Sequence, residues 1–197
     1  MKLNLPNKLT LIRCALVPVF LAVLVHVKNM YVACLVSAAV FGIASITDAL
    51  DGNIARKRNL ITDFGKFMDP LADKLLVFGA LLGILYRFDN LRPVFIWCAF
   101  IVIFRELAVT SMRLVVSGSS GKVIAAKMIG KIKTVTQIVA IVVILLEPVL
   151  MGIAAKFANF YTVPVLSYFS MIAMAAMTLI SGIDYIKSYW EFIDPTK

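Results

Sequence analysis

Long apolar runs separated by short polar segments make up most of the chain. Each run has about 20 residues, which is the length that a helix needs to cross the hydrocarbon core of a bilayer. The pattern predicts six transmembrane helices, at residues 10–26, 31–50, 69–86, 93–116, 131–151 and 161–185. We therefore expect an all-α integral membrane protein in which residues 1–197 form a single membrane domain.

The first 13 residues alternate between polar and apolar positions and include three cations, Lys2, Lys8 and Arg13. This pattern is typical of a short amphipathic segment at the membrane surface, here interrupted by Pro6. A basic start before an apolar run also fits a signal peptide, but no small-x-small cleavage site follows residues 17–27. We expect the segment to remain on the chain.

Composition and charge agree with a membrane location. The chain is 61% hydrophobic with a mean hydropathy of +0.94, whereas a soluble domain is about half apolar. The net charge is +9, but the basic residues are spread between the apolar runs and do not form one stripe. This distribution favours anionic lipid headgroups, and not nucleic acid, as the partner of the basic residues. Three cysteines inside apolar runs, Cys14, Cys34 and Cys98, lack metal-ligand spacing.

The placement of Lys and Arg predicts the orientation. With the N-terminus inside, the inner segments contain 14 basic residues and the outer loops contain four, Lys28, Arg87, Arg92 and Lys156. Cytoplasmic segments of membrane proteins carry such an excess. We expect both termini in the cytoplasm.

Four aspartates stand at the ends of two predicted spans. Asp48 and Asp51 are three residues apart, and Asp69 and Asp73 are four apart, so each pair lies on one face of a helix. Ionisable residues near hydrocarbon indicate function, and carboxylate oxygens suit Mg²⁺ or Mn²⁺. Interhelical salt bridges are the alternative, but carboxylates outnumber cations at this depth. The sequence predicts a site for divalent ions where the two faces converge.

Residues beside the aspartates predict a phosphate-containing ligand. Gly52 and Ala55 are small and would let a ligand approach the backbone closely, while Arg56 offers donors matched to phosphate. These residues extend the predicted metal site toward a nucleotide or phosphate site.

The start of the third span has two interpretations. Asp69 could cap a helix whose first residue is Pro70, or a longer helix could begin near Gly65 and be kinked at Pro70. Both interpretations bring Asp69 and Asp73 together.

A second cluster of charges follows further along the chain. Arg105 lies within the fourth predicted span, where snorkelling to water is costly, and Arg113 follows it. Lys131 and Lys133 open the fifth span beside a polar Thr/Gln face. These four cations predict a site for an additional anion, whereas ordinary membrane anchoring suits Lys122 and Lys127. Two further acids near span ends, Glu147 and Asp184, are expected at the membrane interface.

These residues match the signature of a known family. The chain resembles the CDP-alcohol phosphatidyltransferases at every signature position, in the pattern Asp48-x2-Asp51-Gly52-x2-Ala55-Arg56-x8-Gly65-x3-Asp69-x3-Asp73. The resemblance extends over the whole chain. Residues 105–113 and 130–137 look like the bacterial phosphatidylglycerophosphate synthase branch of this family.

The resemblance implies an activity and its partners. A member of this branch transfers the phosphatidyl group of CDP-diacylglycerol to the 1-hydroxyl of sn-glycerol 3-phosphate and releases CMP, using two divalent ions, Mg²⁺ or Mn²⁺. It implies a homodimer in the bacterial cytoplasmic membrane with its active site at the cytoplasmic face. The implied metal ligands are Asp48, Asp51, Asp69 and Asp73, and Asp73 is also the implied general base. The implied CDP site contains Gly52, Ala55, Arg56 and Gly65, and the acceptor phosphate site contains Arg105, Arg113, Lys131 and Lys133, with Arg13 and Lys66 as further candidates.

Three alternatives stay open from the residues alone. The acceptor could be inositol phosphate, which would also use the basic cluster, or serine, which would not need it. Membrane prenyltransferases also use aspartates to hold magnesium and a pyrophosphate, but in two separated halves of a longer chain. A divalent-cation transporter would place its acids along a path near the bilayer midplane, whereas here they gather at one face.

Overall fold

The computed structural model describes residues 4–57, 62–120, 128–155 and 163–190. This part of the chain is helical and contains no strand. Its six helices are α1 (Leu5–His26), α2 (Met30–Lys57), α3 (Asp63–Arg87), α4 (Arg92–Ser120), α5 (Met128–Ala154) and α6 (Val165–Tyr189). The predicted all-α fold class is confirmed.

Five of the six helices, all except α3, are long and apolar enough to cross a membrane. Helix α3 has 25 residues but carries Asp69, Asp73 and Lys74 in its first half, which lowers its hydropathy. Several helices of this length and composition are typical of a multi-pass membrane protein.

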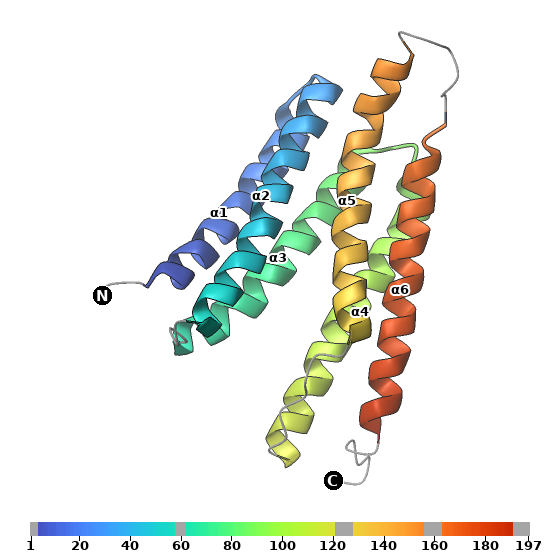
Figure 1. The fold of residues 1–197 in the computed structure, drawn as a ribbon. Helices are drawn as coiled ribbons and strands as arrows, with labels where there is room; N and C mark the ends of the chain where they lie inside the picture. Colours follow the sequence, from blue (N-terminus) through green and yellow to red (C-terminus); the bar gives the residue numbers. More distant parts are fainter. Residues whose placement is uncertain (1–3, 58–61, 121–127, 156–162, 191–197) are drawn as a thin grey trace.

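The helices run side by side in alternating directions (Figure 1). The N-terminal ends of α1, α3 and α5 therefore gather with the C-terminal ends of α2, α4 and α6 at the lower end of the bundle in Figure 1. Helix α1 packs against α2 and α3, whereas α6 packs against α4 and α5. Contacts of α2 with α5 and of α3 with α4 and α5 join these two groups of helices.

Two glycines bring α3 close to α1. A Cβ atom at Gly79 would lie 2.5 Å from Cγ1 of Val17, and one at Gly83 would lie 2.8 Å from Cδ1 of Leu24. The largest fully buried apolar side chains come from five helices and the segment between α3 and α4: Phe20, Leu24, Phe41, Leu81, Ile84, Leu91, Phe95, Ile141, Ile144, Leu145. Close packing of this core fixes how the polar ends of the helices face one another.

The predicted N-terminal segment is continuous with the first span in its described residues, because α1 begins at Leu5 and continues to His26. Asn4 caps this helix by accepting a hydrogen bond from the Asn7 backbone at 3.1 Å. Pro6 does not interrupt it, because the backbone N–H that proline lacks would have no partner within the helix in its first turn. Asn7, Thr10 and Arg13 of this helix are buried within the bundle, whereas Lys8 is exposed.

Helices α2 and α3 extend beyond their predicted spans toward each other. The second span was predicted to end at residue 50, but α2 continues to Lys57. The polar residues Arg56 and Lys57 therefore belong to the helix and not to a loop. Helix α3 begins at Asp63, where Thr62 accepts a hydrogen bond from the Gly65 backbone at 3.1 Å. The interpretation with Asp69 as the cap is therefore wrong, and the longer helix containing Pro70 is closer to the structure.

Glu147, which was predicted near the membrane interface, is buried within the bundle and only 1% exposed. Its carboxylate accepts hydrogen bonds from the backbone N–H groups of Leu166 and Ser167, at 2.9 and 2.7 Å, and from the Ser167 hydroxyl. These donors are free groups of the first turn of α6, so α5 caps α6 with a buried carboxylate. The sixth span was predicted to begin at Tyr161, which lies outside the described residues. Helix α6 begins at Val165.

Candidate active site

Helix α1 supplies a cation to the first aspartate. The guanidinium of Arg13 is fully buried, and its Nη1 lies 2.5 Å from Oδ1 of Asp48 on α2. The Asp48 side chain is 43% exposed. A buried guanidinium needs such a charged partner, so this ion pair ties the start of α1 to the end of α2.

Polar contacts also surround Asp69 on α3. The hydroxyl of Thr10 donates to Oδ1 of Asp69 at 2.7 Å. A Cβ atom at Gly65 would lie 3.0 Å from Oδ1 of Asn7 and 3.7 Å from Oδ2 of Asp69. Gly65 therefore leaves the space beside this carboxylate open.

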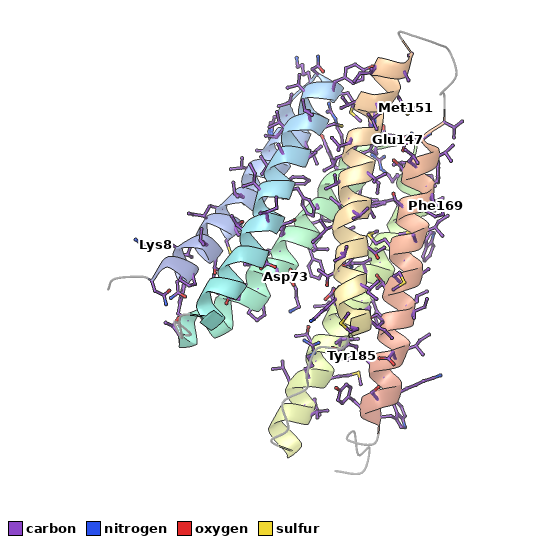
Figure 2. All side chains as sticks on the ribbon, viewed as in Figure 1. Lys8, Asp73, Glu147, Met151, Phe169 and Tyr185 are labelled. Carbon is purple, nitrogen blue, oxygen red and sulfur yellow. The ribbon has the colours of Figure 1, made fainter. Side chains whose placement is uncertain are left out.

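Asp73 lies one helical turn beyond Asp69 and connects the aspartates with the basic cluster. Its carboxylate interacts electrostatically with Asp48 on α2 and with Glu106 and Lys133 on α4 and α5. Figure 2 labels it on α3, at the centre of the bundle between α2 and α5. Asp73 therefore lies where the two groups of helices meet.

A cavity of about 220 Å³ contains Asp73 together with all four predicted acceptor cations. Helices α3 to α6 all contribute to its lining, which consists of Asp73, Arg105, Glu106, Arg113, Gly130, Lys131, Lys133, Thr134 and Tyr185. The cations come from α4 and α5, where they are 18 to 28 residues apart between helices. The fold brings them to one cavity, as the sequence predicted.

Buried partners hold these cations in place. Glu106 pairs with Lys133 and lies 3.4 Å from Nη1 of Arg105. Arg105 also donates to the Ser181 hydroxyl of α6 at 2.6 Å. The cavity contains four cations and two carboxylates, which gives a formal net charge of +2. This positive balance favours an anion as ligand.

Tyr185 is a cavity residue that the sequence analysis missed. It is 2% exposed, and its ring centre lies 5.5 Å from Cζ of Arg105 and 5.0 Å from Cζ of Arg113. Arg113 also donates a hydrogen bond to its hydroxyl oxygen. The four-residue spacing from Ser181 places both residues on one face of α6, but only the fold reveals that this face meets the two arginines.

Several predicted residues are placed differently or fall outside the description. The side chains of Asp51, Gly52, Ala55, Arg56 and Lys66 lie outside the described set, although their backbones continue α2 and α3. Arg13, a further candidate for the acceptor site, instead pairs with Asp48. The structure thus describes three of the four signature aspartates and all four acceptor cations.

The described aspartates have the chemistry of a site for hard cations. Asp48, Asp69 and Asp73 offer only carboxylate oxygens, which Mg²⁺ and Mn²⁺ prefer. Among the described side chains, no three His, Cys, Asp or Glu residues are already grouped around a metal position. Asp48 and Asp69 are held by Arg13 and Thr10 of α1 instead. The donor type fits a divalent ion, with Asp51 as a candidate outside the described side chains.

Comparison with protein families decides the relationship. The family model for CDP-alcohol phosphatidyltransferase matches residues 3–183. The chain belongs to the CDP-alcohol phosphatidyltransferase family. Membership makes it an enzyme of phospholipid biosynthesis.

Relatives within this family resemble the chain over nearly its whole length. A CDP-diacylglycerol–glycerol-3-phosphate 3-phosphatidyltransferase of Bacillus subtilis is 43% identical, covering 95% of this chain and 96% of its own. A probable phosphatidylglycerophosphate synthase of Mycobacterium tuberculosis is 39% identical over 93% of this chain and 80% of its own. A Rickettsia felis protein with the same name as the first is 32% identical over 94% of each chain.

A solved structure supports the fold. The crystal structure of phosphatidylinositol phosphate synthase from Mycobacterium tuberculosis, in its apo form, superimposes with a TM-score of 0.64. The match covers 96% of this chain and 92% of the other at 17% identity. At this identity the likeness concerns the arrangement of helices and not the choice of acceptor.

Proposed function

We propose that the protein transfers the phosphatidyl group from CDP-diacylglycerol to sn-glycerol 3-phosphate, giving phosphatidylglycerophosphate and CMP. The names of the three relatives support this reaction. The observation that carries the proposal is the cavity that joins Asp73 with Arg105, Arg113, Lys131 and Lys133. A phosphorylated alcohol needs a base for its hydroxyl and cations for its phosphate, and this cavity offers both.

The charge of the cavity favours a phosphorylated acceptor over serine. A phosphate monoester carries a charge of about −1.5 to −2 at neutral pH, close to the opposite of the cavity's formal +2. Serine has no net charge at this pH and would leave the positive charge of the cavity unbalanced. Inositol phosphate satisfies the same charge argument, and the identity of the relatives favours glycerol 3-phosphate over it.

Asp73 is the proposed general base of the transfer. Its carboxylate would accept the proton of the acceptor hydroxyl as that oxygen attacks the phosphorus of the phosphatidyl group. One P–O bond forms to the acceptor oxygen, and the P–O bond to the CMP phosphate breaks, so CMP departs with the bridging oxygen. Lys133 and Arg105, both paired with Glu106, would hold the acceptor phosphate while the hydroxyl faces Asp73.

The CDP-diacylglycerol side of the site is proposed to lie at the end of α2 and the start of α3. Asp48, Asp51, Asp69 and Asp73 would hold two divalent ions, Mg²⁺ or Mn²⁺, and Gly52, Ala55, Arg56 and Gly65 would line the CDP site. When bound, such ions supply charge neutralisation for the pyrophosphate and the leaving phosphate. Thr10 and Arg13 of α1 would orient Asp69 and Asp48.

The membrane arrangement is proposed from the same features. Helix α3 would be the sixth span, because its 25 residues run between other apolar helices. With both termini in the cytoplasm, the end of the bundle that holds the aspartates meets the cytoplasm, where CMP and glycerol 3-phosphate are soluble. We propose a homodimer in the bacterial cytoplasmic membrane.

CMP release by the purified protein in detergent tests the proposed function. CDP-diacylglycerol and Mg²⁺ are supplied, with glycerol 3-phosphate, inositol phosphate or serine offered in separate reactions. We expect release only with glycerol 3-phosphate, loss of release on adding EDTA, and recovery with excess Mg²⁺. Each arm contains the same lipid, so any difference between arms reports the acceptor alone.

Release with inositol phosphate or serine and not with glycerol 3-phosphate would contradict the acceptor assignment. Release that persists in EDTA would contradict the divalent-ion site. Failure with every acceptor would contradict the proposed transfer to these three alcohols.

A further inference from the structure

Tyr185 occupies a central position in the cavity without being part of the family signature. Its ring lies against both arginines, at 5.5 Å from Cζ of Arg105 and 5.0 Å from Cζ of Arg113, and its hydroxyl accepts a hydrogen bond from Arg113. The residue is 2% exposed. Two like charges therefore share one buried aromatic ring beside the proposed acceptor site.

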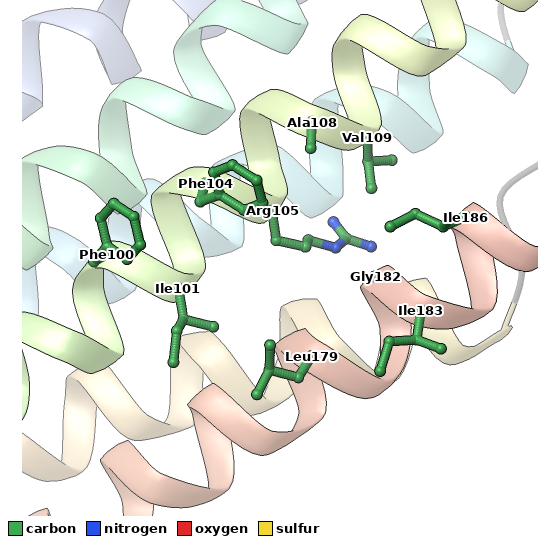
Figure 3. A pocket seen from close by; sticks show the side chains of 10 residues that line it. All are labelled: Phe100, Ile101, Phe104, Arg105, Ala108, Val109, Leu179, Gly182, Ile183 and Ile186. Atoms are coloured by element: carbon green, nitrogen blue, oxygen red, sulfur yellow. The ribbon is translucent and has the colours of Figure 1, made fainter. Parts of the chain in front are cut away.

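Arg105 reaches this position across the apolar contact between α4 and α6. A Cβ atom at Gly182 would lie 3.1 Å from Cγ of Arg105, so the absence of a side chain at Gly182 lets the arginine stem lie against α6. Figure 3 shows Arg105 extending from α4 toward α6, between apolar side chains of the two helices. The cavity on this side, of about 290 Å³, has Arg105 as its only charged lining residue among those described.

The guanidinium therefore has polar neighbours on one side only. Within the described part of the chain these are Ser181, Glu106 and the face of Tyr185. The buried Nε of Arg105 has no hydrogen-bond partner among the described residues. Tyr185 is the aromatic group among these neighbours, and it contacts the guanidinium together with Glu106 and Ser181.

We propose that Tyr185 is a positioning residue for the acceptor phosphate, acting through Arg105 and Arg113. The negative face of an aromatic ring attracts a guanidinium, most strongly where water is excluded. A shared ring also reduces the conformational freedom of both arginines, so less entropy is lost when the phosphate binds. This inference rests on the proposed acceptor site.

The KM values of the two substrates test the role of Tyr185. Tyr185→Leu removes the ring and the hydroxyl, and we expect it to raise the KM for glycerol 3-phosphate about tenfold, the effect of losing a desolvated cation–π contact. The KM for CDP-diacylglycerol should stay within about twofold. Tyr185→Phe keeps the ring and loses only the bond to Arg113, so it should raise the acceptor KM less, about threefold.

A matched control comes from the other end of the same helix. Tyr168 donates its hydroxyl to the backbone oxygen of Asn90 at 3.1 Å, far from the cavity, so Tyr168→Phe removes an equivalent group. This control should leave both KM values unchanged. Adding Tyr185→Leu to Arg113→Ala should raise the acceptor KM by less than Tyr185→Leu does alone, because the two residues act through one contact.

The outcomes separate positioning from a structural role and from failure of the proposed function. Equal changes in both KM values, or an acceptor KM for Tyr185→Phe and Tyr185→Leu that matches the parent enzyme, would overturn the inference. If Tyr185→Leu does not fold, Tyr185→Phe decides the question. If the parent enzyme uses another phosphorylated alcohol, the acceptor assignment fails while the same KM comparison, made with that alcohol, still tests Tyr185.

Discussion

At the scale of single residues, the charges of the site are paired across helices. Arg13 of α1 pairs with Asp48 of α2, and Lys133 of α5 pairs with Glu106 of α4. A buried cation held by a carboxylate is fixed in place but keeps donors for a second anion, since an ammonium has three. The pairing therefore prepares Lys133 for a phosphate.

Lys133→Ala should weaken acceptor binding selectively. The change removes one of four cations around a phosphate of about two charges, so we expect the KM for glycerol 3-phosphate to rise about tenfold or more. The KM for CDP-diacylglycerol should change much less. Steady-state CMP release at varied concentrations of each substrate measures both values.

Lys187→Ala is the matched control, because Lys187 is exposed on α6 and does not line the cavity. It should leave both constants unchanged. An equal rise of the two KM values in Lys133→Ala would argue against an acceptor role for this residue.

At the scale of elements, α1 carries the polar contacts that hold the two aspartate-bearing helices. Thr10 bonds Asp69 of α3 and Arg13 bonds Asp48 of α2, so the position of α1 controls both carboxylates. Close packing between α1 and α3 at Gly79 and Gly83 sets that position.

Gly79→Leu should loosen this packing. Its Cβ alone would come within 2.5 Å of Val17 Cγ1, so the helices would have to separate, at a cost of about 1–3 kcal/mol. We expect a lower thermal unfolding midpoint in detergent and reduced CMP release. Gly42→Leu is the control, because a Cβ at Gly42 meets no atom within 4 Å among those compared. Equal midpoints for the two variants would contradict the role given to the α1–α3 contact.

The apolar pattern predicted the helices well and their ends poorly. Spans are visible in sequence because a bilayer demands about 20 apolar residues in a row. The polar first turns of α1 resemble a surface segment unless their partners are known, and these partners lie 35 to 59 positions away, as in the pairs Arg13–Asp48 and Thr10–Asp69. The burial of Glu147 could not be foreseen for the same reason, since its donors belong to the next helix.

The types of residue in the site could be predicted from the sequence, but their arrangement in space could not. Aspartates and cations stand out in an apolar chain because they are costly there, so the signature and the basic cluster were found. Tyr185 is unremarkable in sequence, because an aromatic residue near the end of a span is ordinary. Its role depends on α4 and α6 crossing so that both arginines meet one ring.

At the scale of the whole molecule, the site lies where two groups of helices meet. Arg13 of α1 contacts Asp48 of α2, and the arginines of α4 contact Ser181 and Tyr185 of α6. Asp73 lies between them, since it lines the basic cavity and also interacts with Asp48. We therefore assign the role of general base in the phosphatidyl transfer to Asp73. The lipid nucleotide would lie on one side of it and the phosphorylated alcohol on the other.

Turnover and lipid binding by Asp73→Asn test this central assignment most directly. Asparagine keeps the size of the side chain but cannot accept the hydroxyl proton, so CMP release should fall by about a hundredfold or more. Most of the binding of CDP-diacylglycerol should remain, and Asp89→Asn, at an exposed aspartate between α3 and α4, should leave both properties unchanged. CMP release by Asp73→Asn at a rate close to that of the parent enzyme would contradict the account.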